Sequence, residues 1–319
     1  MTDVAASRSR GSSLPSLCTA EAHPRGEGEP AARTAPRVSE ALIGSVPPPI
    51  LVLLSVVSIQ VGAALAVKLF PALGPAGTVF LRIGFSALIL LAVSRPSLQG
   101  ITFRGAALLV TFGALIGCMN LCFYESIARL PLGVAVTIEF TGPLAVAVAT
   151  SRRPLDFLFI GLAIAGLVAM TPAIGRGIDP AGVALALLAG AGWGGFAVLS
   201  RRVGHAFEGG TGLALGMAVA ALVLLPSFVF GGAAERVDPI LLLGGLAVAL
   251  LATAIPFSLE FQALKRLPPR TYGVLVTLEP AVATVIGIAV LGEALTIHTV
   301  AALACVTAAA LGMALTARN

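Results

Sequence analysis

Beyond residue 47 the sequence consists almost entirely of apolar stretches, and this feature decides what the chain can fold into. About 20 apolar residues form a helix long enough to cross the ~30 Å hydrocarbon core of a bilayer. Ten such stretches can be drawn, near 48–67, 75–94, 105–126, 133–150, 155–173, 181–200, 211–230, 239–263, 271–291 and 297–316. Short segments of alternating hydrophobicity, the pattern of outer-membrane barrels, are not seen. The sequence therefore predicts an all-α integral membrane protein with ten transmembrane helices.

The charged residues indicate how these helices are oriented. Only 11% of the residues are charged and 57% are apolar, a composition that excludes a water-soluble domain. The net charge of +5 comes from basic residues between the apolar stretches, so it marks topology rather than nucleic-acid binding. With the N-terminus inside, ten basic residues fall on the cytoplasmic side, Arg95, Arg104, Arg152, Arg153, Arg201, Arg202, Lys265, Arg266, Arg270 and Arg318. Four fall outside, Lys68, Arg129, Arg176 and Arg236, so both termini are predicted to be cytoplasmic.

Residues 1–46 differ in kind from the rest. They are rich in Ser, Pro, Gly, Arg and Glu, and no apolar core of a signal peptide follows the first basic residues. We expect a disordered cytoplasmic tail, and its composition does not indicate a role.

Cysteine and histidine patterns predict no metal, no cofactor and no enzyme. The four cysteines, Cys18, Cys118, Cys122 and Cys305, match neither a zinc site nor a disulfide framework. Three histidines, one of them in the tail and two near membrane edges, are hard to combine into a catalytic set.

One phrase occurs twice in the apolar region. GVAVTIE ends at Glu139 and GVLVTLE ends at Glu279, with five of seven letters the same, and an RLP triplet precedes each copy. The copies fall in the fourth and ninth predicted helices, so they divide the ten helices into two sets of five, 47–173 and 174–319. Because five is odd, the two sets must cross the membrane in opposite orientations, as in inverted-repeat transporters.

The repeated glutamates are the first candidates for a functional site. In this topology Glu139 and Glu279 each lie about eight residues, or ~12 Å, from opposite membrane faces. An ionised carboxylate at that depth is costly and usually faces a water-filled cavity or a partner, which suits a proton carrier. The alternative is a structural hydrogen bond between helices. Arg82 is the only basic residue deep in a predicted helix, and it is either a snorkelling residue or a partner of Glu139 or of a substrate carboxylate.

Further residues are expected to interrupt helices or to line a cavity. Gly142, Pro143, Pro256 and Pro280 loosen or break the helix and free carbonyl groups near the acids, although prolines are common in membrane helices. Gln60 and Trp193 occupy matching places in the two halves, so both are expected to line the cavity, with a packing or lipid-facing role as the alternative for the tryptophan. Asn120 can bond across helices or contact a substrate. Glu125 and Glu260 lie near helix ends, where they either line the cavity or face solvent.

Small residues predict close helix packing. The stretch AGAGWGGFA (189–197) and the pair Gly113 and Gly117 have the composition that lets helix backbones approach. Such faces serve internal packing and homodimer formation equally well, so the oligomeric state stays open.

Three long segments resemble a known family. Residues 58–82, 119–157 and 258–296, with the patterns EFTGPLAVA and LEPA followed by LGEALT, are similar to bacterial threonine/homoserine exporters of the Rht type, in the EamA family of the drug/metabolite transporter superfamily. The resemblance covers about 48–317. It implies two inverted five-helix EamA repeats, an inner-membrane location and export of small amino acids driven by protons.

The expected function is thus an inner-membrane exporter whose partners are a small amino acid, protons and the lipid bilayer. The expected mechanism places the substrate ammonium near Glu139 and freed carbonyls, and its carboxylate near Arg82. One alternative is an EamA exporter of another small metabolite or amino-acid analogue, which competition by such compounds would reveal. Another is a non-transporting membrane sensor or assembly partner, in which the intramembrane acids would tolerate substitution.

Overall fold

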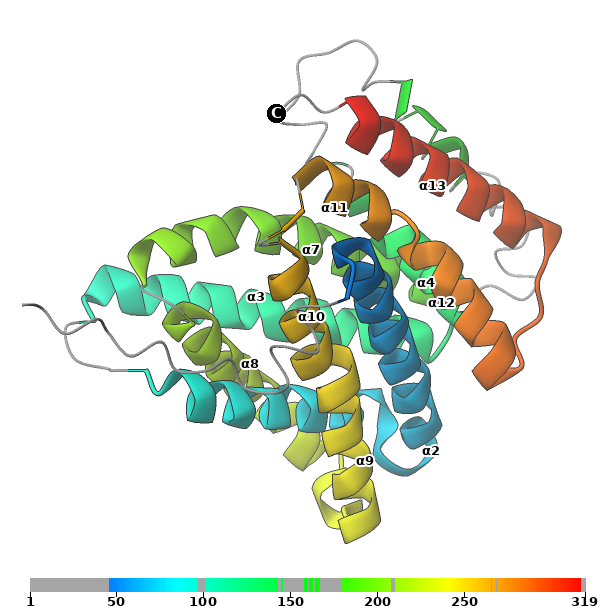
Figure 1. The fold of residues 1–319 in the computed structure, drawn as a ribbon. Helices are drawn as coiled ribbons and strands as arrows, with labels where there is room; N and C mark the ends of the chain where they lie inside the picture. The colour runs from blue at the N-terminus through cyan, green and yellow to red at the C-terminus, as the bar shows by residue number, and fades with distance from the viewer. Residues whose placement is uncertain are drawn as a thin grey trace, which may run out of the picture. The chain divides into compact units, whose positions relative to one another are not determined.

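All regular elements that the structure describes are helices (Figure 1). The structure is a computed structural model that describes residues 46–96, 101–142, 145, 158–159, 161–162, 164–166, 179–207, 210–264, 266–267 and 269–316. The predicted tail and most of the fifth predicted helix, 155–173, lie outside the described residues. Five described helices are long and apolar enough to cross a membrane: Pro48–Ser94, Phe103–Ile127, Pro180–Ala206, Thr211–Phe230 and Pro239–Phe257.

The first and second predicted helices form one bent element, α2 (Pro48–Ser94). Its 47 residues would span ~70 Å as one straight helix, more than twice the hydrocarbon core. The element bends at Gly74, whose φ of 68° is a left-handed value that favours glycine, with Pro71 and Pro75 on either side. Residues 68–73, which we expected to link two helices, continue the first helix up to this bend.

Small residues let α3 (Phe103–Ile127) pack against both α7 (Pro180–Ala206) and α8 (Thr211–Phe230), and α3 and α8 also pack on α2. A Cβ atom on Gly113 of α3 would lie 2.5 Å from the carbonyl oxygen of Gly216 on α8, and one on Gly192 of α7 would lie 2.6 Å from Cβ of Met119. These approaches are too close for a larger residue. The prediction that both glycine-rich stretches serve close packing is therefore confirmed.

The eighth predicted helix contains a widened turn. It is divided into α9 (Pro239–Ala249), the π-helical η3 (Leu250–Ala254) and α10 (Ile255–Leu264). α9 begins after Asp238, whose carboxylate accepts a hydrogen bond from the Leu241 amide. The run lies beside α2 (Figure 1), and the short 3₁₀ helix η2 (Ala234–Arg236) precedes it.

The two copies of the repeated phrase end at helix breaks. α4 (Leu132–Glu139) ends at the first glutamate, four residues before Pro143 in the sequence. α11 (Pro269–Val276) ends four residues before Pro280, and α12 (Glu279–Ile286) begins at the second glutamate. A proline ring clashes with the carbonyl four residues earlier, which explains where α11 stops.

The chain then continues through the π-helical η4 (Gly287–Leu291) and a non-helical link to α13 (Ile297–Thr316). α12 packs on α4, so the two helices that carry the repeated glutamates lie side by side (Figure 1). Pro143 itself lies outside the described residues.

Candidate functional site

A cavity of about 210 Å³ lies among α2, α3, α7, α8, η3 and α10. Most of its lining is apolar, and its polar side chains come from four residues. The lining residues are Ile59, Arg82, Ile83, Ile116, Met119, Asn120, Trp193, Phe196, Leu213, Met217, Ala252, Thr253, Pro256, Phe257 and Glu260. An apolar pocket with a few polar groups of both charges is suited to a small zwitterion.

Arg82 contacts three neighbours from one side of the cavity. Its Nη1 donates to Oδ1 of Asn120 at 3.1 Å and to the hydroxyl of Tyr124 at 3.3 Å, and its Nη2 donates to the carbonyl oxygen of Ala252 at 3.4 Å. The guanidinium carbon also lies 5.5 Å from the centre of the Tyr124 ring, a cation–π distance. None of the described carboxylates forms an ion pair with this guanidinium.

The π-helical turn explains why a carbonyl is available to Arg82. Pro256 has no N–H, so one helical donor is missing for the carbonyl four or five residues earlier, that of Ala252 or Leu251. Side chains from α2 replace it, because Ser58 Oγ donates to Leu251 at 2.7 Å and Arg82 donates to Ala252. The predicted effect of Pro256 thus takes the form of a widened turn rather than a break.

Glu260 lines the cavity through α10, and two hydroxyl groups hold it. Ser55 Oγ donates to its Oε1 at 2.6 Å, and the Tyr272 hydroxyl donates to its Oε2 at 3.2 Å. Its position near a helix end left open whether it faced solvent, and the tertiary structure places it at the cavity. Both carboxylate oxygens retain further acceptor capacity.

Glu139 and Glu279 lie at the two helix breaks, at the end of α4 and at the start of α12. Gln60 Nε2 donates to Oε1 of Glu279 at 3.1 Å, whereas the Gln60 Oε1 is buried without a partner. Glu139 lies within electrostatic reach of both Glu279 and Arg82. Neither glutamate nor Gln60 is among the cavity-lining residues.

Two glycines allow α4 to approach α7 beside Glu139. A Cβ on Gly190 of α7 would lie 2.5 Å from the Glu139 carbonyl oxygen, and a Cβ on Gly142 would collide with the carbonyl of Gly190. Gly142, which we expected to loosen the helix, is also required for this close crossing. Trp193 follows on the same face of α7 and packs edge-on against Phe140.

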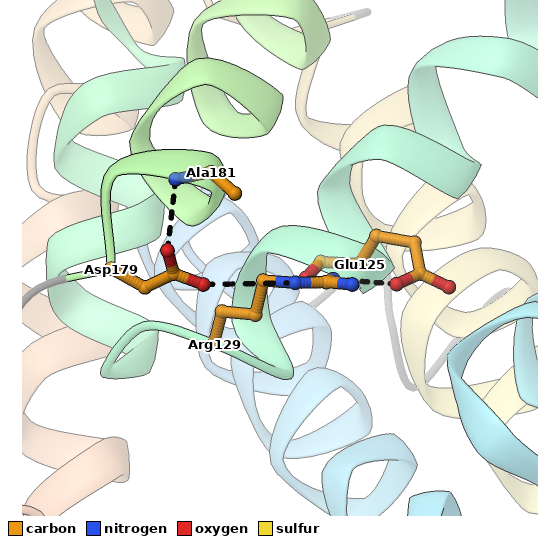
Figure 2. A network of polar contacts seen from close by, with 4 residues as sticks. All are labelled: Glu125, Arg129, Asp179 and Ala181. Atoms are coloured by element: carbon orange, nitrogen blue, oxygen red, sulfur yellow. Dashed lines mark hydrogen bonds and ion pairs between the residues drawn. The ribbon is translucent and has the colours of Figure 1, made fainter.

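Glu125 is placed elsewhere, in the ion-pair network of Figure 2. It pairs with Arg129 one helical turn later, and Arg129 Nε lies 3.7 Å from Oδ2 of Asp179. Asp179 also caps α7 by accepting from the Ala181 amide at 2.9 Å (Figure 2). Such partly exposed ion pairs each contribute about 0–1 kcal/mol to stability. The network connects the end of α3 with the start of α7, away from the cavity-lining residues.

The sequence did not single out several polar residues of this region. Ser55 and Tyr272 bond to Glu260, and Tyr124 bonds to Arg82. Ser58 bonds to the Leu251 carbonyl, and Thr253 lines the cavity with a buried, unpartnered hydroxyl. A hydroxyl residue in an apolar helix is common, so only its spatial neighbours reveal its role. No three His, Cys, Asp or Glu side chains group for a metal ion within the described part of the chain.

Comparisons with known proteins agree with this architecture. A model of the EamA-like transporter family matches residues 180–315. The chain is 44% identical over 279 residues to the threonine/homoserine exporter RhtA of Salmonella typhimurium (strain LT2), with 85% of this chain and 92% of that protein covered. It is likewise 44% identical over 277 residues to the threonine/homoserine exporter RhtA of Escherichia coli (strain K12), with the same coverage.

A protein of known crystal structure has a similar fold. It is 21% identical, with a TM-score of 0.54 over 88% of this chain and 99% of its own. The sequence relationships and the apolar helices indicate a multi-pass protein of the bacterial inner membrane. The chain belongs to the EamA-like transporter family, and it is a transporter rather than an enzyme.

Proposed function

We propose that this protein exports small amino acids of the threonine/homoserine type in exchange for protons, with the substrate bound in the cavity beside Arg82. The relatives that carry this name are 44% identical to the chain. The observation that carries the proposal is the arginine itself, a cation at the cavity that lacks a carboxylate partner among the described residues.

The hydrogen bonds of Arg82 leave a defined part of its guanidinium for a ligand. The group has five N–H donors. Three are used, by Asn120, Tyr124 and Ala252, and the Nε–H has no partner. This leaves the buried Nε–H and one Nη2–H. In this proposal the two donors face the same edge of the guanidinium and bind the substrate carboxylate. A carboxylate accepts such a parallel pair of donors through both its oxygens.

Glu260 is the best-placed anchor for the substrate ammonium group. It lines the same cavity, and Ser55 and Tyr272 fix its orientation. The carbonyls freed by Pro256, which we expected to receive the ammonium, already accept from Ser58 and Arg82. A zwitterion is therefore held between Arg82 and Glu260, with room for a short side chain against the apolar lining.

Glu139 and Glu279 carry the protons in this proposal. They lie close enough to interact electrostatically, so a charge on one opposes a charge on the other. Glu139 also senses the charge of Arg82, whose environment changes when a substrate carboxylate binds. Protons from outside load this pair, and the altered charge beside Arg82 favours release of the substrate as the halves rock.

The proposed topology has ten helices in two inverted repeats, 47–173 and 174–319, with the 1–46 tail and both termini in the cytoplasm. Three contacts agree with the sides to which this topology assigns these segments. Gly77 lies against Ala233, and Arg129 against Asp179, which the topology assigns to the outer side. Gly210 lies against Ser94, on the assigned inner side.

The test is uptake of labelled threonine into inverted membrane vesicles that contain this protein, with an imposed proton gradient. We expect accumulation that stops when an uncoupler collapses the gradient. Accumulation that ignores the uncoupler would contradict proton exchange. No uptake above that of empty vesicles would contradict the substrate assignment, and a panel of metabolites and amino-acid analogues would then replace threonine.

A further inference from the structure

Glu293 makes a contact between the two halves that the proposed transport cycle does not yet use. It lies in the non-helical link between η4 and α13, 14 residues after Glu279 in the sequence. Its Oε1 accepts a hydrogen bond from the backbone N–H of Leu132 at 2.8 Å, and the N–H of Gly133 also bonds to the carboxylate. The contact spans 161 residues of sequence.

These two amides belong to the first turn of α4, the helix that ends at Glu139. The first N–H groups of a helix have no partner within the helix, and Pro131, the residue before α4, supplies no side-chain cap. Glu293 fills that role from the other half of the chain. A carboxylate at this end also complements the helix dipole. The position of the Glu139-bearing helix thus depends on a residue of the second half.

The surrounding backbone leaves space for this carboxylate. Gly287 lies against the Glu293 carboxylate, and a Cβ atom at Gly287 would collide with Oε2. Gly292, with a φ of 70°, turns the chain just before Glu293. On the other side of the contact, a Cβ on Gly133 would collide with Thr284 of α12. Three glycines therefore permit one carboxylate and two helices to meet.

The matching position in the first half does not repeat the residue. Fourteen residues after Glu139 the sequence has Arg153, where the same offset from Glu279 gives Glu293. An acid therefore occurs at this position in only one half. The proposed topology places Glu293 at the outer end of the transporter, on the same side as Arg129 and Asp179.

We propose that Glu293 is a positioning residue that ties α4 to the second half and so closes the outer end of the transporter, a contact that breaks when the cavity opens outward. This inference rests on the proposed alternating access. Leu132 and Gly133 move with the Glu139-bearing helix, while Glu293 stays with α12 and η4. The bond therefore stabilises one state of the cycle and not the other.

Two physical effects act on this carboxyl in opposite directions. Burial raises the pKa of Glu293, and the hydrogen bonds from Leu132 and Gly133 lower it. In either protonation state the group keeps an oxygen that can accept from these amides. Glu293→Gln keeps a carbonyl oxygen that can accept one N–H, whereas Glu293→Ala removes the acceptor altogether.

The test measures how accessible the cavity is from outside, and it needs no substrate. The four native cysteines are replaced by alanine, and Met217→Cys places one reporter thiol at the cavity. Right-side-out vesicles then receive a membrane-impermeant thiol reagent. Losing hydrogen bonds to a charged group shifts an equilibrium about tenfold or more, so we expect Glu293→Ala to be labelled at least about tenfold faster than the parent.

Matched variants separate closure from a general loss of structure. Glu293→Gln should be labelled at a rate between those of the parent and Glu293→Ala. Gly287→Ala, whose Cβ displaces the carboxylate without removing it, should also label faster. Glu235→Ala, an exposed carboxylate of η2, should behave as the parent.

Equal labelling of Glu293→Ala, Gly287→Ala and the parent would overturn the inference. So would slower labelling. If the parent moves no threonine in inverted vesicles but these differences in labelling remain, the substrate proposal fails and the outer closure stands.

Discussion

Replacing Arg82 by lysine tests the substrate site most directly, because it keeps the positive charge and removes the planar fork. In the structure two of five N–H donors, on Nε and Nη2, have no protein partner and are assigned to the substrate carboxylate. An ammonium group places its donors differently and cannot present the parallel pair. At least one charge-assisted hydrogen bond to the substrate is then lost.

The magnitude follows from that loss. A hydrogen bond to a charged group contributes about 1.5–3 kcal/mol, and 1.4 kcal/mol corresponds to a factor of ten. Arg82→Lys should therefore raise the KM for threonine about 10- to 150-fold in the vesicle assay. Arg82→Gln should raise it at least as much, because the charge is also gone.

A substrate analogue connects the effect to the carboxylate. Threoninol has an alcohol in place of the carboxylate, so it cannot accept both N–H bonds of the Arg82 guanidinium through two oxygens. The parent should prefer threonine over threoninol as a competitor, and Arg82→Lys should lose most of that preference. Such a pairing of protein and ligand changes isolates one interaction.

The control is Arg236→Lys, an exposed arginine whose guanidinium bonds only to carbonyls of its own turn in the described contacts. It should leave KM unchanged. If Arg82→Lys transports threonine with the KM of the parent, or keeps the full preference over threoninol, then the substrate carboxylate does not bind at Arg82.

The remaining predictions concern coupling, packing and the widened turn. Glu139→Gln and Glu279→Gln should each abolish gradient-driven accumulation while exchange of internal for external threonine persists, and full accumulation by both variants would refute the coupling scheme. Gly190→Ala should lower the free energy of unfolding by about 1–3 kcal/mol, because its Cβ would lie 2.5 Å from the Glu139 carbonyl oxygen. Gly204→Ala, which has open space around it, should leave stability unchanged, and thermal unfolding in detergent measures both variants. Pro256→Ala restores a backbone N–H that competes with Arg82 and Ser58 for the carbonyls of Ala252 and Leu251, so transport should fall while the folded yield is kept; unchanged transport would show that the widened turn is not needed.

The sequence determined that the chain is built of apolar helices, and it located several of their breaks. In a bilayer the backbone must satisfy its hydrogen bonds within each segment, so apolar length alone specifies a helix. Proline acts within four residues, which is why α11 ends at Val276 ahead of Pro280. The repeated phrase located Glu139 and Glu279, and the small residues of α3 and α7 predicted that these two helices pack closely.

Tertiary structure alone decided which polar groups meet. Glu260 joined the cavity because Ser55 and Tyr272 come from other helices, and Gln60 reached Glu279 across 219 residues. Glu125, with similar sequence surroundings, pairs instead with Arg129. Glu293, which the sequence presented as a link residue, caps α4 from the opposite half. Hydrogen bonds within a segment depend on neighbouring residues and can be predicted from them. Small residues likewise show that a helix face can pack closely, but no local pattern records which distant helix it meets.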